Sequence, residues 1–272
     1  MFRPTLLITL LLCTCALATL RAQDGLFPAY DATARLLGGT GLTNTGFDGL
    51  WTNPAALGKT EPTLQAGVGA EQRFQLSELT VATAGVTYGL KNSGFGVQLA
   101  SFGFDSYREN RLGVAYGRQL TERLRIGVDL AAFGTATEGY ASTFDLTFGL
   151  GLQLEIIPEL HVGARVFSPI RVERLPEEFL PQLLALGLSY RPSDQLTLNV
   201  EAHQDSDFPV RFRVGADYRP VEQLSIRLGL ATEAAELSFG LGYRVAQRLG
   251  LTAGAVYHEV LGLSPVVGVS WR

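Results

Sequence analysis

The dominant pattern in this chain is an alternation of apolar and polar residues that begins near residue 63 and continues to the end. Over 195–204, leucine and valine alternate with threonine, asparagine and glutamate, and the same rhythm returns over 211–218 and 236–244. A period of two places the two sets on opposite faces of a β-strand. One face is therefore almost wholly Leu, Val, Phe and Tyr, while the other is rich in Gly, Arg, Asp and Glu.

Fourteen such segments follow one another, and each is about ten residues long, the length that spans a bilayer as a tilted strand. Their predicted ranges are 63–74, 78–90, 95–104, 107–118, 124–135, 141–154, 159–167, 182–191, 195–204, 209–219, 223–232, 235–245, 248–258 and 263–271. An even number of strands with one apolar face is typical of a transmembrane antiparallel β-barrel. A soluble β-sandwich, the alternative, would bury its apolar face and leave some strands apolar on both faces. The pattern favours an all-β outer-membrane barrel over 63–272.

Every second connection between these strands repeats one motif, as in YRPSDQL, YRPVEQL and YRVAQRL. Tyr190, Tyr218 and Tyr243 each stand just before such a turn. Tyrosine suits the boundary between membrane and water, because its ring lies in lipid while its hydroxyl stays hydrated. These connections are therefore predicted to be the short periplasmic turns of the barrel.

The other connections would face outward, and the long one among them is SPIRVERLPEEFLP, residues 168–181. Leu175, Phe179 and Leu180 lie there among charged residues and prolines. An apolar group with a polar rim resembles a small interface core, so this loop is a candidate docking site for a protein partner. A lid folded over the barrel mouth is the alternative.

The first 22 residues read as a cleaved secretory signal peptide, with Arg3 before an apolar run and small residues before Gln23. Cys13 and Cys15 both lie in it, so the mature chain has no thiol for a disulfide or a thiolate metal site. Loss of Arg3 and Arg21 leaves 20 basic against 26 acidic residues, a net charge of −6. Without any basic block, nucleic acid is an unsuitable partner. No later run of 18 apolar residues predicts a membrane-spanning helix.

Residues 23–62, which we call the plug segment, do not alternate. Asn53-Pro54 ends any preceding helix and starts a turn, and the glycines permit close backbone contact with a glycine-rich wall. The segment is therefore predicted to fill the barrel lumen, with a periplasmic tail as the alternative. The predicted plug residues are Gly38, Gly39, Asp48, Trp51, Asn53, Pro54, Ala55 and Leu57.

Ala34-Arg35, the Gly38-Gly39 turn, Asp48 and the run Asn53–Leu57 together resemble the N-terminal signature of FadL-like outer-membrane barrels, and in particular the PorV/PorQ family. The chain departs from that signature at Ala56, where glycine is usual, and at Asp48, which stands alone where an acidic pair is common. The resemblance implies a fourteen-strand barrel in the outer membrane of a Gram-negative-type bacterium.

Two non-enzymatic functions follow from the resemblance. Likeness to PorV/PorQ implies an accessory partner of a type IX secretion or surface-attachment machine. Likeness to FadL implies a passive transporter of hydrophobic small molecules. A transporter needs an apolar pocket of hundreds of cubic ångströms, and residues 168–181 form the only outer connection long enough to contribute to one. The sequence therefore favours the partner role.

Catalytic and cofactor motifs fail on inspection. Leu57–Thr60 resembles the end of a phosphate-binding loop, but Asn53 stands where its first glycine belongs, and Asn44 replaces the third glycine of a dinucleotide fingerprint. The three histidines lie on different strands, and His203 beside Asp205 is the one weak acid–base candidate. We therefore predict no catalytic residue, metal or cofactor.

Charges of both signs are predicted to face the lumen, which favours a closed salt-bridge lattice over a single-sign pore filter. The predicted inward residues are Arg73, Arg125, Arg165, Arg211, Arg213 and Arg227 with Glu71, Asp129, Asp145, Glu201, Asp217 and Glu236. Neighbouring positions should then respond differently to substitution. An arginine at lipid-facing Val214 should be costly, whereas a serine at lumen-facing Gly215 should be mild.

Overall fold

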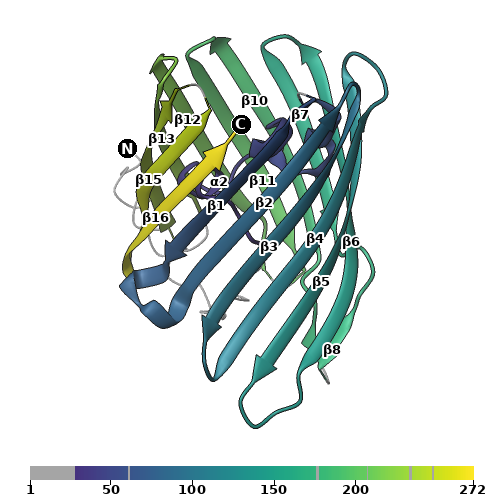
Figure 1. Ribbon diagram of the computed structural model, residues 1–272, viewed down its shortest axis with the longest axis vertical. Helices are drawn as coiled ribbons and strands as arrows, with labels where there is room; N and C mark the ends of the chain where they lie inside the picture. The colour runs from purple at the N-terminus through teal and green to yellow at the C-terminus, as the bar shows by residue number, and fades with distance from the viewer. Residues whose placement is uncertain (1–27, 61, 176–177, 207, 233–234, 247) are drawn as a thin grey trace, which may run out of the picture.

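A computed structural model describes residues 28–60, 62–175, 178–206, 208–232, 235–246 and 248–272. Fourteen strands of these described residues form one closed antiparallel barrel, in which β1 pairs with both β2 and β16 (Figure 1). The strands are β1 Leu64–Gln72, β2 Thr80–Leu90, β3 Ser93–Phe104, β4 Tyr107–Gln119, β5 Leu124–Thr137, β6 Thr143–Ile157, β7 Leu160–Phe167, β10 Leu183–Ser193, β11 Leu196–Asp205, β12 Arg211–Val221, β13 Leu224–Ala231, β14 Glu236–Val245, β15 Leu249–His258 and β16 Gly262–Trp271.

The barrel confirms the predicted fold class. Each predicted strand has its counterpart, and most ends differ by one or two residues. The structure adds a small hairpin, β8 Glu173–Leu175 with β9 Glu178–Phe179, inside the connection between β7 and β10. The predicted signal peptide, residues 1–22, lies outside the described residues, and the domain boundaries at 22 and 62 stay predictions.

Alternation along each strand separates an apolar outer surface from a polar inner one. On β12 the side chain of Val214 is 41% exposed, whereas that of its neighbour Arg213 is 6% exposed. The outer residues are mostly Leu, Val, Ile, Phe and Tyr, and they cover the wall on all sides of the barrel. Such a band faces lipid, because apolar surface of this extent is unfavourable in water. The chain is thus an outer-membrane type of barrel.

The hydrogen-bonded wall is continuous between neighbouring strands. Register shifts occur between Tyr190 and Ser193, Tyr218 and Val221, and Glu155 and Ile157, and all three lie beside short turns. The end of the barrel that carries these turns is called the short-turn end here, and the opposite end, with residues 168–182, is the loop end. Tyr190, Tyr218 and Tyr243 are half exposed on the outer surface at the short-turn end, where aromatic residues commonly mark a membrane interface.

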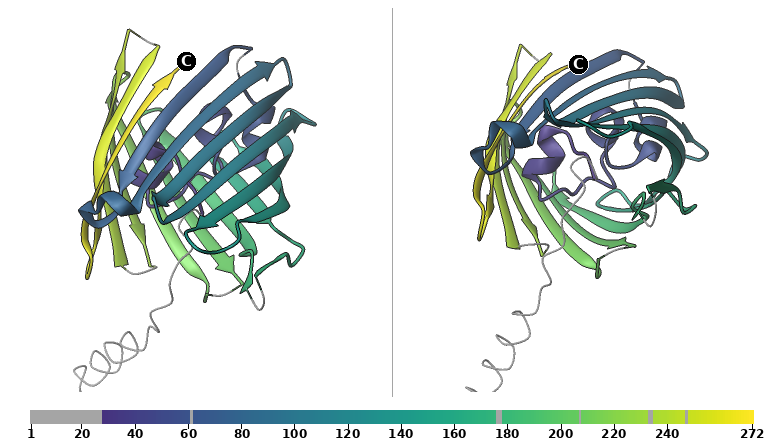
Figure 2. Two further views of the ribbon diagram at one scale, coloured as in Figure 1. Left: turned by 60° about the horizontal axis from the view of Figure 1, so that its bottom comes forward. Right: turned by 90° about the horizontal axis from the view of Figure 1, so that it is seen from below.

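The described part of the plug segment lies inside the barrel (Figure 2). It contains one short α-helix, α2 Ala32–Leu36, and two 3-10 turns, η2 Gly46–Gly49 and η3 Pro54–Gly58. No helix among the described residues is long and apolar enough to cross a membrane. Leu36, Leu42, Leu50, Trp51 and Leu57 are almost completely buried, so the apolar core of the molecule forms between this segment and the inner wall.

Candidate functional site

The turn of the plug segment at Asn53 is bound to the backbone of the wall. The Asn53 side-chain amide donates to the carbonyls of Leu42 (2.8 Å), Leu152 (3.1 Å) and Ala164 (3.3 Å), and its oxygen accepts from the Ala55 amide (3.1 Å). Asn53 thereby caps η3, whose first residue is Pro54. An extended asparagine followed by proline suits such a cap, because proline lacks the N–H that would otherwise be unpaired.

Two wall glycines make this contact possible. A Cβ at Gly151 would lie 2.0 Å from the Asn53 side-chain oxygen, and one at Gly127 would lie 2.3 Å from the Pro54 carbonyl carbon. Real side chains cannot approach so closely. On the inner face of β5 and β6, glycine at these two positions therefore leaves the room that the plug segment needs for contact with the wall.

The helix α2 is held by charge. Asp31 caps its first turn by accepting from the amides of Thr33 (3.1 Å) and Ala34 (3.3 Å). Arg35 then donates to Glu71 on β1 (2.9 Å) and, through both terminal nitrogens, to Glu236 on β14 (2.6 and 3.0 Å). Burial, followed by the negative charge of Asp48, raises the pKa of Asp31 to about 6.

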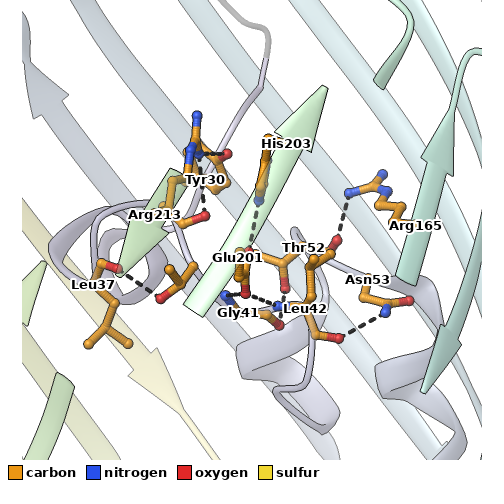
Figure 3. A network of polar contacts seen from close by, with 12 residues as sticks. Tyr30, Leu37, Gly41, Leu42, Thr52, Asn53, Arg165, Glu201, His203 and Arg213 are labelled. Atoms are coloured by element: carbon orange, nitrogen blue, oxygen red, sulfur yellow. Dashed lines mark hydrogen bonds and ion pairs between the residues drawn. The ribbon is translucent and has the colours of Figure 1, made fainter. Parts of the chain in front are cut away.

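Between these two anchors the backbone of the plug segment binds wall side chains (Figure 3). Glu201 on β11 accepts from the amides of Gly41 (2.7 Å) and Leu42 (2.8 Å) through one oxygen, and its other oxygen is 2.8 Å from the His203 ring. Arg165 on β7 donates to the carbonyls of Trp51 (2.9 Å) and Thr52 (3.1 Å). Two strands on the same side of the barrel, separated only by β10, thus hold the centre of the segment.

The remaining predicted plug residues also lie in the lumen. Gly38 donates to the Ser238 hydroxyl (3.0 Å), the Gly39 carbonyl accepts from Arg213 (3.3 Å), and both glycines have positive φ. Asp48 forms an ion pair with Arg272, at the short-turn end. Ala55 and Leu57 are fully buried. The predicted plug residues therefore contact the wall at several places along the segment, and they do not form a single small-molecule site.

The plug segment alters two expectations about the lumen. Glu71 and Glu236 pair with Arg35 of this segment rather than only with wall arginines, so the salt-bridge lattice includes it. Gly215 was expected to tolerate serine, but a Cβ there would lie 2.4 Å from the Thr40 hydroxyl and 2.7 Å from the Leu37 carbonyl. That expectation is wrong, because the lumen at Gly215 is filled by backbone.

The loop 168–181 corrects one candidate interface residue. Leu180 is 3% exposed and packs with Leu42, Phe133, Phe167 and Leu183 at the loop end of the lumen, so it is not available to a partner in this structure. Phe179 is half-buried under the Arg171 guanidinium, 3.6 Å from the ring centroid. The surroundings of the Leu175 side chain lie outside the described part of the chain. Leu180 thus closes part of the loop end of the lumen, and Arg174 of the hairpin forms an ion pair with Asp145 of β6.

A cavity lies between the plug segment and the loop end. Its enclosed volume is about 20 Å³, and the empty space amounts to about 390 Å³ when the part that opens to solvent is counted. The lining combines apolar groups, aromatic rings and a few charges: Pro28, Ala29, Tyr30, Gly39, Leu42, Trp51, Thr52, Arg111, Arg165, Phe167, Leu183, Ala185, Glu201 and His203. An apolar pocket with a few convergent polar groups is the usual form of a small-molecule site.

One charged residue that lines this cavity was not identified from the sequence. Arg111 on β4 is 3% exposed and lies 5.9 Å from the Trp51 ring and 5.3 Å from the Phe167 ring. The sequence could have predicted that Arg111 faces the lumen, because Leu112 and Val114 lie at the alternate positions that face outward. The His203 ring lies 2.8 Å from a Glu201 oxygen, a carboxylate other than the Asp205 that the sequence suggested. Among the described residues, no group of three or more His, Cys, Asp and Glu could hold a metal ion.

Comparison with solved structures finds the same fold in bacterial channels. The toluene transporter TbuX of Ralstonia pickettii superposes with a TM-score of 0.70 at 14% identity, covering 92% of this chain and 100% of that one. The toluene transporter TodX of P. putida gives 0.71 at 14%, covering 90% and 99%. A FadL homologue of Pseudomonas aeruginosa gives 0.64 at 11%, covering 89% and 97%.

These structures share a FadL-like fourteen-strand barrel with this chain. No family model matches the sequence, and no curated protein matches it. At such low identity the likeness concerns the fold.

Proposed function

We propose that this protein is a non-enzymatic channel that lets small hydrophobic molecules cross the outer membrane passively. The observation that carries the proposal is the cavity between the plug segment and the loop end, where Trp51, Phe167, Leu183 and Ala185 supply apolar walls. The similar structures support the same class, because two of them are named as toluene transporters. In this proposal a molecule enters the cavity from the loop end, and the plug segment delays it.

Uptake by whole cells tests this function. Expression in a Gram-negative host should increase the rate of uptake of radiolabelled toluene. Replacing Ala185, which is fully buried in the cavity wall, by tryptophan should fill the cavity and return uptake to that of cells without the protein. Ala216→Trp on the outer face of β12 is the matched control. Uptake that does not depend on expression of a heat-modifiable, folded barrel would contradict the proposal.

A second candidate is the accessory role in protein secretion or surface attachment that likeness to PorV/PorQ implies. The supporting observation is the β8–β9 hairpin at the loop end (Figure 1), whose Phe179 lies against Arg171. Purification from the native outer membrane tests it. A protein that co-purifies with the wild type and is lost from Phe179→Ser supports the partner role, and retention of that protein places the interface elsewhere.

A further inference from the structure

Two arginines in the cavity share one carboxylate. Arg165 donates from one terminal nitrogen to both oxygens of Asp129, at 3.1 and 3.3 Å. Arg111 reaches the same carboxylate only at 3.9 Å. Within the described chain, Nε and Nη2 of Arg111 have no hydrogen-bond partner. A buried guanidinium with unused donors is unfavourable, and an added anionic acceptor would relieve that penalty.

The surroundings of Arg111 specify more than a charge. Its guanidinium carbon lies 5.9 Å from the Trp51 ring centroid, 5.6 Å from that of Phe133 and 5.3 Å from that of Phe167. Trp51 and Phe167 line the cavity, together with Leu42 and Leu183. Flat apolar surfaces therefore adjoin the unused donors, and aromatic rings pack favourably against such surfaces in offset or edge-to-face arrangements.

Glu201, a carboxylate that lines the cavity, is already hydrogen-bonded through both of its oxygens. One oxygen of Glu201 accepts two amide N–H groups from Gly41 and Leu42, and the other is hydrogen-bonded to His203. Glu201 is on β11, whereas Arg111 is on β4, and four strands, β10, β7, β6 and β5, separate them along the wall. An anion at Arg111 would meet the unused Nε and Nη2 donors, with Asp129 3.9 Å from Nη2 and held by Arg165.

We propose that this cavity binds a small aromatic carboxylate, with the carboxylate on Arg111 and the ring against Trp51 and Phe167. The inference rests on the proposed function, and it deepens it by naming the substrate class. Guanidinium and carboxylate are complementary, since two parallel N–H donors match two oxygens. A neutral hydrocarbon would fill the same apolar walls and leave the Arg111 donors unpaired, so it binds more weakly.

Binding of three probes to the purified, detergent-solubilised protein tests the class. Benzoate has the ring and the charge, benzyl alcohol has the ring with a neutral hydroxyl in place of the charge, and acetate has the charge alone. Isothermal titration calorimetry should give the lowest Kd for benzoate. The fluorescence of Trp51, measured in a Trp271→Phe background because Trp271 is the second tryptophan and lies exposed on the outer wall, should change with benzoate and locate it in the cavity.

Arg111→Gln isolates the charge. It should weaken benzoate binding by roughly 10- to 100-fold, the range expected for loss of a charged hydrogen-bond partner, and should leave benzyl alcohol binding unchanged. Arg108→Gln, an exposed position on the same strand, is the matched control. Heat-modifiable migration on gels verifies that each variant folds.

The comparison within the wild type does not depend on a variant. If benzyl alcohol binds as tightly as benzoate, or if Arg111→Gln weakens both equally, the cavity does not select carboxylates and the inference fails. The proposed channel function is then judged separately by toluene uptake, which requires no charge on the substrate. Benzoate binding without any uptake of either compound would instead overturn the channel function and retain the site.

Discussion

Replacing Arg35 by methionine removes the charge that holds helix α2 in the lumen. Methionine keeps the length and apolar stem of the side chain, so packing changes little. The substitution leaves Glu71 and Glu236 without the cation that both contact at 3.0 Å or less. Removing one member of a buried ion pair costs about 3–5 kcal/mol, because the other charge stays buried.

The structure places the expected effect at the lower end of that range. The side chains of Arg35 and Glu236 are 16% and 21% exposed, and Arg73 lies 4.0 Å from Glu71, so the remaining charges are partly solvated and partly paired. We expect the docked state of α2 to lose about 3 kcal/mol, roughly a hundredfold in the equilibrium between docked and undocked states. An undocked helix no longer blocks its part of the lumen.

Single-channel recording in planar bilayers measures this equilibrium. Arg35→Met should raise the fraction of time in a conducting state by roughly two orders of magnitude. The combined variant with Glu71→Gln and Glu236→Gln should recover most of the closed time, because it replaces both carboxylates that Arg35→Met alone leaves without this cation. Arg108→Gln, which removes an exposed pair with Asp105 at 3.9 Å, should have no effect. Unchanged conductance in Arg35→Met would refute the idea that this ion pair holds the lumen closed.

Three further perturbations address the wall, the lipid face and the helix cap. Gly127→Val should destabilise the protein by about 1–3 kcal/mol in a urea titration, and the effect should vanish once residues 24–58 are deleted, since the clash is with Pro54. Val214→Arg, 41% exposed to lipid, should cost about 2–4 kcal/mol in refolding into bilayers, and a loss no larger than for Val214→Ala would contradict its orientation. The pKa of Asp31 is raised from 3.8 to about 6. Its contribution to the stability of the docked state is therefore fully present below pH 3.8 and is lost as the pH rises through 6. Asp31→Asn keeps a capping residue and should therefore stabilise docking at pH 8 by up to about 3 kcal/mol but not at pH 3.5, measured as closed time.

The barrel could be predicted from the sequence because each strand carries its own evidence. A residue's face depends on its parity within the strand, and the Tyr-Arg turns mark every second connection. The position of Arg111 follows from the same rule, although nothing local indicates that two arginines would share Asp129. That sharing depends on the register between β4, β5 and β7, which the sequence does not specify at the level of single contacts.

The lumen was less predictable, because its occupant does not repeat. Gly215 is indistinguishable in sequence from a glycine that faces water, and only the path of residues 37–40 explains why it has no room for a side chain. Leu180 similarly reads as an exposed leucine in a charged loop. Its burial results from the β8–β9 hairpin, which turns the end of the loop back toward Leu42 and Phe167. Both differences arise where segments distant in sequence meet inside a closed wall.

The plug segment has two halves that are held by different forces, and this difference indicates where a passage could open. The half around Asn53 is bound by hydrogen bonds to wall carbonyls and by contact with Gly127 and Gly151, so its release would leave buried backbone groups unpaired. The α2 half is held by packing of Leu36 and by charged side chains, and water can solvate these charges when the contact separates. Movement of α2 therefore costs less than movement of η3. In the proposed channel, a passage would therefore open at α2, where Arg35 bridges β1 and β14, while the Asn53 turn remains in place.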